Sequence, residues 1–193
     1  MFVMTVDQRG SRRDVDRVDP ILHEFADAPL LRPFERTAGD EVQAVADRAD
    51  LVVDLALELA ARGYWSVGIG IGPVESPLPA STRAGRGPAY EAARDAVDRA
   101  KNLPGSIAVT GPDTASATDA ETALMLVSAL MSRRSEPGRD AVAAMREGLT
   151  QAEAAERLGI SKQAISQRLA VAGWQAECAG RTLARRLLQE AAR

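Results

Sequence analysis

The chain has 193 residues and a mass of 20.5 kDa, and its 24 basic and 27 acidic side chains give a formal net charge of −3. Apolar residues make up 46% of it, which is typical of a soluble globular protein and argues against wholesale disorder. One Cys and one His exclude a disulfide framework and a Cys/His zinc cluster, and no stretch approaches the ~20 apolar residues of a membrane span. We therefore expect a cytoplasmic protein without a membrane segment.

The first 110 residues alternate strand-like and helix-like segments. Short apolar runs predict the strands, and the pair Gly39-Asp40 predicts a tight hairpin between two of them. The predicted strands are 2–6, 31–37, 42–45, 65–71 and 106–110, and the predicted helices are 19–27, 48–62 and 89–100. This order predicts an α+β sandwich of ferredoxin-like type, in which a helix layer covers one antiparallel sheet and one helix and one strand are added.

The strand signals stop near residue 117. A helix is predicted over 119–131, the stretch 132–138 is typical of a linker, and further helices follow, including 139–147 and one that begins at Trp174. The charge changes sign at about the same place: residues 1–132 hold 13 basic and 20 acidic side chains, and residues 133–193 hold 11 and 7. We therefore predict two domains, an acidic one over 1–132 and a small basic helical one over 133–193.

The stretch 149–169, LTQAEAAERLGISKQAISQRL, predicts a helix-turn-helix. Thr150 and Glu153 form a capping box at the start of one helix, Gly159 ends that helix after barely two turns, and Ser161 caps the next. Five apolar residues are spaced to close a small core between the two helices: Ala155, Leu158, Ile160, Ile165 and Leu169. These are the requirements of two short helices that cross sharply.

The second of these helices has a polar face without acids. That face can hydrogen-bond base edges and phosphates, and the alternative is a helical hairpin whose polar face is only solvated. The segment resembles the helix-turn-helix of sigma factor region four and of related regulators, which implies double-stranded DNA as the partner. The predicted DNA-binding residues are Thr150, Ser161, Lys162, Gln163, Ser166, Gln167 and Arg168. Because one small motif binds DNA weakly, we expect a homodimer.

The last helix carries Arg181, Arg185 and Arg186 near one another on its surface. These side chains either meet DNA phosphates or belong to a solvated helix face. The sequence leaves both interpretations open.

Three carboxylates, Asp7, Asp40 and Glu41, are expected to meet where the first strand faces the hairpin. A strand ending in Asp, a Gly-Asp-Glu hairpin and a Gly-alternating strand resemble the class III nucleotide cyclase and GGDEF superfamily. This resemblance implies that Asp7 and Asp40 hold Mg²⁺ against a nucleoside triphosphate, since hard cations take oxygen ligands. The alternative is a turn whose acids cap backbone groups.

The same resemblance extends to some basic residues and fails at one position. Arg36 stands where many cyclases have a purine-reading Lys, and Arg94 is retained, but Tyr90 replaces the Asn expected in the following helix. Arg83 and Arg86 in the long loop 73–87 can meet phosphates if that loop is a lid or a binding loop; the alternative is a disordered connection. The residues predicted to bind a nucleotide are therefore Arg36, Arg83, Arg86 and Arg94.

A resemblance to the SatD family covers nearly the whole chain. It is carried, in order, by VDQRGSR, TAGDEVQAV, VGIGIG, GRGPAYEAARDAVDRAK and the Gln-rich helix-turn-helix leading to AGW. It implies a cyclase-like domain followed by a helix-turn-helix. The chain departs from the family pattern in a shortened stretch after Arg13, so we expect a truncated first helix.

Alternating glycines at positions 68, 70 and 72 leave one face of the strand 65–71 without side chains. Either a nucleotide or partner strand approaches that bare face, or a helix packs tightly against it.

The resulting hypothesis is a DNA-binding transcriptional regulator, not an enzyme, with a degenerate cyclase-like sensory or dimerisation domain. The alternatives are an Mg²⁺-dependent nucleotide cyclase-like enzyme and a protein-interaction module that does not bind DNA.

Overall fold

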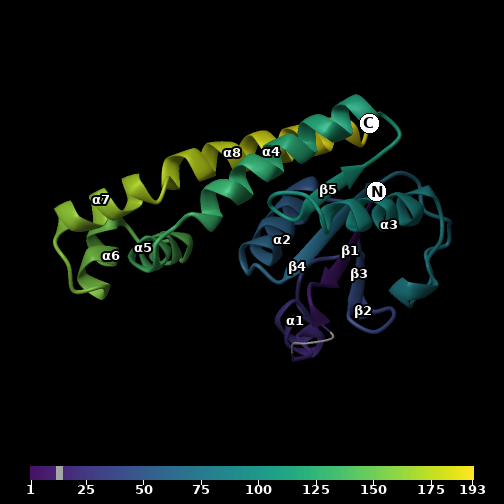
Figure 1. Cartoon of the computed structure of the whole chain (residues 1–193), viewed down its shortest axis with the longest axis horizontal. Helices are drawn as coiled ribbons and strands as arrows, with labels where there is room; N and C mark the ends of the chain where they lie inside the picture. The colour runs from purple at the N-terminus through teal and green to yellow at the C-terminus, as the bar shows by residue number, and fades with distance from the viewer. Residues whose placement is uncertain (12–14) are drawn as a thin grey trace.

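One sheet of five strands forms the centre of the N-terminal part of the molecule (Figure 1). Its strands are β1 (Phe2–Gln8), β2 (Arg32–Arg36), β3 (Glu41–Ala46), β4 (Trp65–Ile71) and β5 (Ile107–Thr110), in the order β2-β3-β1-β4-β5. β1 is antiparallel to β3 and β4, β2 is antiparallel to β3, and β4 is parallel to β5. The computed structural model describes residues 1–11 and 15–193, so the shortened stretch after Arg13 begins outside the described residues.

Helices cover both faces of this sheet. They are α1 (Val18–Glu24), α2 (Ala49–Ala61), α3 (Pro88–Ala100), α4 (Thr114–Ser132), α5 (Glu136–Arg146), α6 (Gln151–Arg157), α7 (Lys162–Val171) and α8 (Trp174–Ala191), with the short turn η2 (Thr82–Ala84) before α3. α1, α2, α4 and α8 share one apolar core with Phe2, Met4 and Val6 of β1, whereas α3 packs against Val3 and Val45 on the opposite face. The α+β prediction is confirmed, but the helices do not form a layer on one face only, because the crossover α3 between the parallel strands β4 and β5 runs over the other face.

The alternating glycines of β4 are explained by the packing of α3. A Cβ atom on Gly68 would lie 2.2 Å from the backbone nitrogen of Val97, and one on Gly70 would lie 2.1 Å from the backbone oxygen of Ala89. Both obstructing atoms belong to the α3 backbone, so a side chain at either position would displace the helix. The interpretation of a tightly packed helix is therefore confirmed for these two glycines.

α4 and α8 form a long antiparallel pair that joins the sheet region to the last short helices (Figure 1). Close approach is possible because Val127 and Leu130 of α4 lie over Gly180 and Gly173. The C-terminal half of α8 places Ala184, Leu188 and Ala191 in the same core as β1. The predicted second segment, 133–193, thus returns to the first one and completes its core.

α5 begins at Glu136, inside the stretch predicted as a linker. Pro137 lies in its first turn, where the missing N–H has no intrahelical acceptor to lose. Pro137 therefore marks the start of a helix and not the middle of a linker. In the described part of the chain, no helix is both long enough and apolar enough to cross a membrane.

Candidate nucleic-acid interface

α5, α6, α7 and the start of α8 enclose a small core of their own. Five of its eight buried residues are alanines, which lets the short helices approach closely. The predicted core residues are all part of it: Ala155, Ile165 and Leu169 are buried, and Leu158 and Ile160 are partly buried against them. The buried members are Ala141, Val142, Ala144, Ala154, Ala155, Ile165, Leu169 and Ala172.

The turn between α6 and α7 has the caps that the sequence predicts. The Thr150 hydroxyl accepts a hydrogen bond from the Glu153 N–H at 3.3 Å, and the Glu153 carboxylate accepts one from the Thr150 N–H at 2.7 Å. Gly159 adopts a φ of +63°, which glycine tolerates at no steric cost, and Ser161 accepts from the N–H of Ala164 at 3.1 Å. These local bonds fix the direction of α7 relative to α6.

α7 presents its polar face to solvent. Lys162, Gln163, Ser166 and Gln167 are exposed, and Arg168 is half-buried. No hydrogen bond or ion pair within the described residues engages any of these five side chains, and α7 contains no acidic residue. Their donors and acceptors are therefore available to an external partner. The other two predicted DNA-binding residues, Thr150 and Ser161, use their hydroxyls as helix caps.

A buried carboxylate, Glu177 of α8, holds the helix-turn-helix against the long helix pair. Its side chain is fully buried, and three arginines surround it. Nε of Arg181 donates a hydrogen bond to Oε1 of Glu177 at 2.6 Å, and Arg146 at the end of α5 donates a second one to the same oxygen. Nη2 of Arg134 lies 2.6 Å from Oε2 of Glu177, at an angle outside hydrogen-bond geometry. Nε of Arg134 also donates to the carbonyl of Ala172 at 2.8 Å. Sequence reasoning missed this cluster because its members lie far apart in the chain.

The charge state of Glu177 follows from these contacts. Burial by itself raises the pKa of the carboxyl, but the hydrogen bonds from Arg181 and Arg146 and the charge of Arg146 outweigh burial, so the pKa of Glu177 is lowered. Glu177 is therefore ionised at neutral pH.

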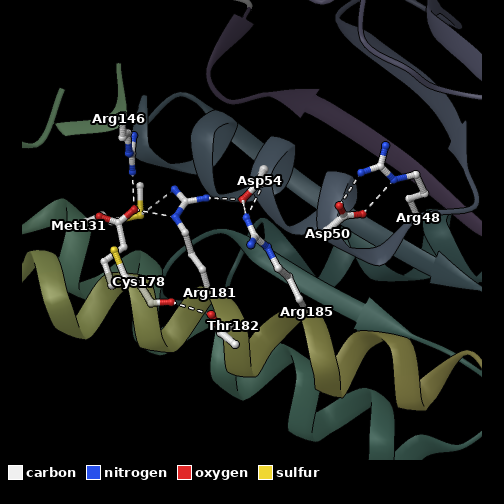
Figure 2. A network of polar contacts seen from close by, with 10 residues as sticks. Arg48, Asp50, Asp54, Met131, Arg146, Cys178, Arg181, Thr182 and Arg185 are labelled. Carbon is white, nitrogen blue, oxygen red and sulfur yellow. Dashed lines mark hydrogen bonds and ion pairs between the residues drawn. The ribbon is translucent and has the colours of Figure 1, made fainter. Parts of the chain in front are cut away.

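Arg181 and Arg185 also bind α2 (Figure 2). Nη1 of Arg181 lies 2.8 Å from Oδ1 of Asp54, and Nη2 of Arg185 lies 2.7 Å from Oδ2 of the same residue. Neither arginine is thus a free phosphate contact or part of a merely solvated face. Arg186, on another side of α8, is exposed.

The three predicted metal-binding carboxylates lie at one end of the sheet. Asp7 pairs with Glu41 in the register of β1 and β3, and Glu41 accepts a hydrogen bond from the hydroxyl of Thr37 at 2.5 Å. Burial raises the pKa of Asp7, the charges of Asp40 and Glu41 raise it further, and Lys101, 3.5 Å away, opposes the rise. No group of three His, Cys, Asp or Glu side chains among residues 1–11 and 15–193 is placed to hold a metal ion.

Three of the four predicted nucleotide-binding arginines line one cavity of about 450 Å³. Arg83, Arg86 and Arg94 surround it together with Gln43 of β3 and Tyr90 of α3. Glu75 and Glu91 also line it. Nε of Arg83 lies 3.5 Å from Oε1 of Glu35. Arg86 and Arg94 have no ion-pair partner within the described residues. The wall of the cavity thus holds two unpaired guanidinium groups beside two carboxylates.

The fourth arginine, Arg36, lies elsewhere. Its Nη2 pairs with Asp16 at 2.7 Å and with Asp19 at 3.0 Å, close to the β2–β3 hairpin. The structure does not bring it to the cavity lined by the other three.

Tyr90, which the sequence identified only as a departure from the cyclase pattern, lines this cavity and has a buried, unpaired hydroxyl. The oxygen is buried directly beneath Gly85, where a Cβ atom would lie 1.8 Å from it, and it has no hydrogen-bond partner within the described residues. Burial raises the pKa of Tyr90, so the hydroxyl keeps its proton at neutral pH.

A family model described as helix-turn-helix matches residues 142–170. No curated protein and no solved structure matches the chain. The matched residues run from α5 to the end of α7, so the comparison bears on these helices and not on the sheet. Together with the caps, the turn and the core, the match confirms the predicted helix-turn-helix.

Proposed function

We propose that this protein is a DNA-binding transcriptional regulator that places α7 in the major groove of double-stranded DNA. The proposal is carried by the acid-free solvent face of α7, whose five polar side chains have no partner within the described residues. The second helix of a helix-turn-helix reads base edges in the major groove.

The residues of this face divide into two roles. Gln163 and Gln167 lie one turn apart and suit bidentate recognition of adenine, whereas Lys162 and Arg168 suit contacts to phosphates. Ser166 lies between them and can serve either role. Thr150 and Ser161 fix the helix ends through their capping hydrogen bonds.

The test is selection of preferred sites from random duplex DNA, followed by gel-shift titration of variants. Gln163→Ala and Gln167→Ala should each reduce the preference for the selected site by about 1–3 kcal/mol for a lost bidentate contact. Lys162→Ala should weaken binding to all sequences and lower the salt slope by about 0.9. Gln189→Ala, at an exposed glutamine near the C-terminal end of α8, is the matched control and should change neither quantity. Unchanged site preference in both α7 variants would remove Gln163 and Gln167 from base recognition.

We further propose that the sheet domain has a cyclase-like, sensory role and binds a phosphate-bearing ligand in the cavity of Arg83, Arg86 and Arg94. The strand order β2-β3-β1-β4 with α1 and α2 is compatible with the ferredoxin-like arrangement implied by the SatD resemblance. The unpaired guanidinium groups of Arg86 and Arg94 favour a phosphate-bearing ligand at this place. Thermal-shift measurements with a nucleotide panel test this, because a ligand that binds only the folded state raises the melting temperature. Arg94→Ala should abolish the shift, whereas Arg99→Ala, at the other end of α3, should preserve it.

An Mg²⁺-dependent cyclase-like activity is the alternative for the sheet domain. A metal between Asp7 and Asp40 would have to displace the contact of Asp7 with Lys101. Incubation with labelled ATP and GTP plus Mg²⁺ or Mn²⁺ tests it, and product that disappears in Asp40→Ala would establish the enzyme. The third alternative, a protein-interaction module, predicts binding that lacks the steep salt dependence of DNA binding.

A further inference from the structure

α4 has an outer face that no other part of the described chain covers. Its inner face packs into the sheet core and against α8, but Leu126 is 63% exposed in the middle of the outer face. Figure 1 shows α4 beside α8 on the side of the molecule away from the strands, so the outer face of α4 is directed to solvent. An exposed leucine in the middle of an ordered helix indicates a contact surface when further features surround it.

A hollow of about 500 Å³ lies next to Leu126. It is bounded by the C-terminal half of α4 and the end of α7, and Val171, the most exposed of the large apolar side chains in the described residues, lines it. Leu130 of α4 and Arg133, the C-cap residue of α4, also line it. Leu126 itself lines this hollow, so the outer face of α4 and the hollow form one surface.

The charges on the outer face of α4 are arranged symmetrically about Leu126. Asp119 lies seven residues before it and Arg133 seven residues after it. Seven residues are close to two helical turns, and Arg133, the C-cap of α4, keeps a right-handed helical conformation, so all three side chains lie on one side of the helix. Both charged residues are exposed, and neither has a hydrogen bond or ion pair within the described residues. The face therefore has one acid and one base at equal distances from its apolar centre.

We propose that α4 binds α4 of a second copy of the chain in an antiparallel arrangement, with the two-fold axis at Leu126. Seven residues correspond to about 10 Å along each helix, so Asp119 of one copy faces Arg133 of the partner subunit and the reverse pair forms at the other end. The partner's Leu126 covers Leu126, and the N-terminal half of the partner's α4 fills the hollow beside Val171. A parallel arrangement would instead oppose like charges.

This pairing also fixes the positions of the two helix-turn-helix units. Each unit follows the C-terminal end of its α4, so the antiparallel arrangement places the two units at opposite ends of the paired helices, related by the two-fold axis. The pairing is independent of DNA binding and is tested without DNA. If the protein binds DNA, its site should be an inverted repeat.

The experiment is the molar mass and dissociation constant of the full chain by sedimentation equilibrium. The wild-type chain should have twice the monomer mass of 20.5 kDa, and Leu126→Glu should be monomeric. Asp119→Arg and Arg133→Asp should each raise the dissociation constant about tenfold or more, because each creates two like-charge contacts. The double variant Asp119→Arg/Arg133→Asp should restore it to within about threefold of wild type.

Asp95→Arg is the matched control, since Asp95 is an exposed helical aspartate on α3, on the other face of the sheet. It should leave the dimer unchanged, and circular dichroism should show that every variant remains folded. A monomeric wild type at the highest soluble concentration, a Leu126→Glu dimer, or a double variant as weak as the single ones would overturn the proposal. Binding of another protein or of DNA by a monomeric wild type would assign the face to that partner and overturn it as well.

Discussion

Glu177→Gln replaces a fully buried carboxylate by a neutral group of the same shape at the junction of α5, α8 and the residues between α4 and α5. Three guanidinium groups then lose the negative charge that they share, and the guanidinium group of Arg134 is itself only 5% exposed. Removing one partner of a buried ion pair costs about 3–5 kcal/mol because the other charge stays buried without compensation.

The structure places this substitution near the lower end of that range. Arg181 keeps its contact with Asp54, and Arg134 keeps its hydrogen bond to the carbonyl of Ala172. Arg146 is more than a third exposed, so solvent screens its charge and its contribution is small. We expect the free energy of unfolding to fall by about 3 kcal/mol.

Urea unfolding at pH 7, followed by circular dichroism, measures this change. Glu147→Gln is the control, because Glu147 pairs with Arg157 in the same part of the chain but both side chains are about half exposed. Its effect should stay below about 1 kcal/mol. Equal effects of the two substitutions would refute the conclusion that Glu177 anchors the helix-turn-helix.

The effect of Glu177 should also depend on pH. Its pKa is lowered by folding from an ordinary value of 4.5, so its stabilising contribution is complete above that value and is lost as the pH falls through the lower pKa of the folded state. The difference in stability between wild type and Glu177→Gln should therefore shrink below about pH 4.5. A difference that stays constant down to pH 3 would contradict the assigned pKa direction.

Three further substitutions test other parts of the structure by the same unfolding measurement. Gly70→Ala should destabilise the protein by about 1–3 kcal/mol or more, since its Cβ meets the backbone of α3 at 2.1 Å, and an unchanged midpoint would show that α3 moves freely. Thr150→Ala removes a helix cap and should lower the free energy of unfolding by about 1 kcal/mol. Thr150→Ser, which retains the capping hydroxyl, should leave it unchanged. Asp7→Asn should stabilise the protein at pH 7, because a raised pKa means that folding disfavours the charged form, and the gain should vanish below pH 3.8, where the acid is protonated in both states. A loss of stability in Asp7→Asn at pH 7 would mean that the contact with Lys101 outweighs burial.

Local sequence signals predicted most of the elements correctly. Thr150, Glu153, Gly159 and Ser161 specify the helix-turn-helix through bonds that span only a few residues, so its boundaries could be predicted without knowledge of the fold. The start of α5 was misplaced because Pro137 is compatible with both a linker and the first turn of a helix.

The candidate sites were harder to predict from the sequence than the helices and strands. The alternating glycines of β4 indicate that something approaches the strand closely, but whether a helix or a ligand does so depends on the position of α3. Arg83, Arg86 and Arg94 were identified as possible ligand contacts, and the fold brings them to one cavity, yet the same reasoning placed Arg36 with them, where local acids bind it instead. The Tyr90 hydroxyl became notable only because the structure buries it without a partner.

The sequence by itself determined the strands, the helices, the caps and the change of charge sign near residue 132, because each of these depends on neighbouring residues or on simple counts. Only the tertiary structure decided how the parts join. In the folded chain α8 packs against the sheet core, and Asp54 contacts Arg181 and Arg185, which lie more than 120 residues away in sequence. Glu177 is buried among three arginines. Such contacts depend on the packing of helices that are distant in sequence, and a guanidinium group has the same local pattern whether it meets a phosphate, solvent or a buried carboxylate.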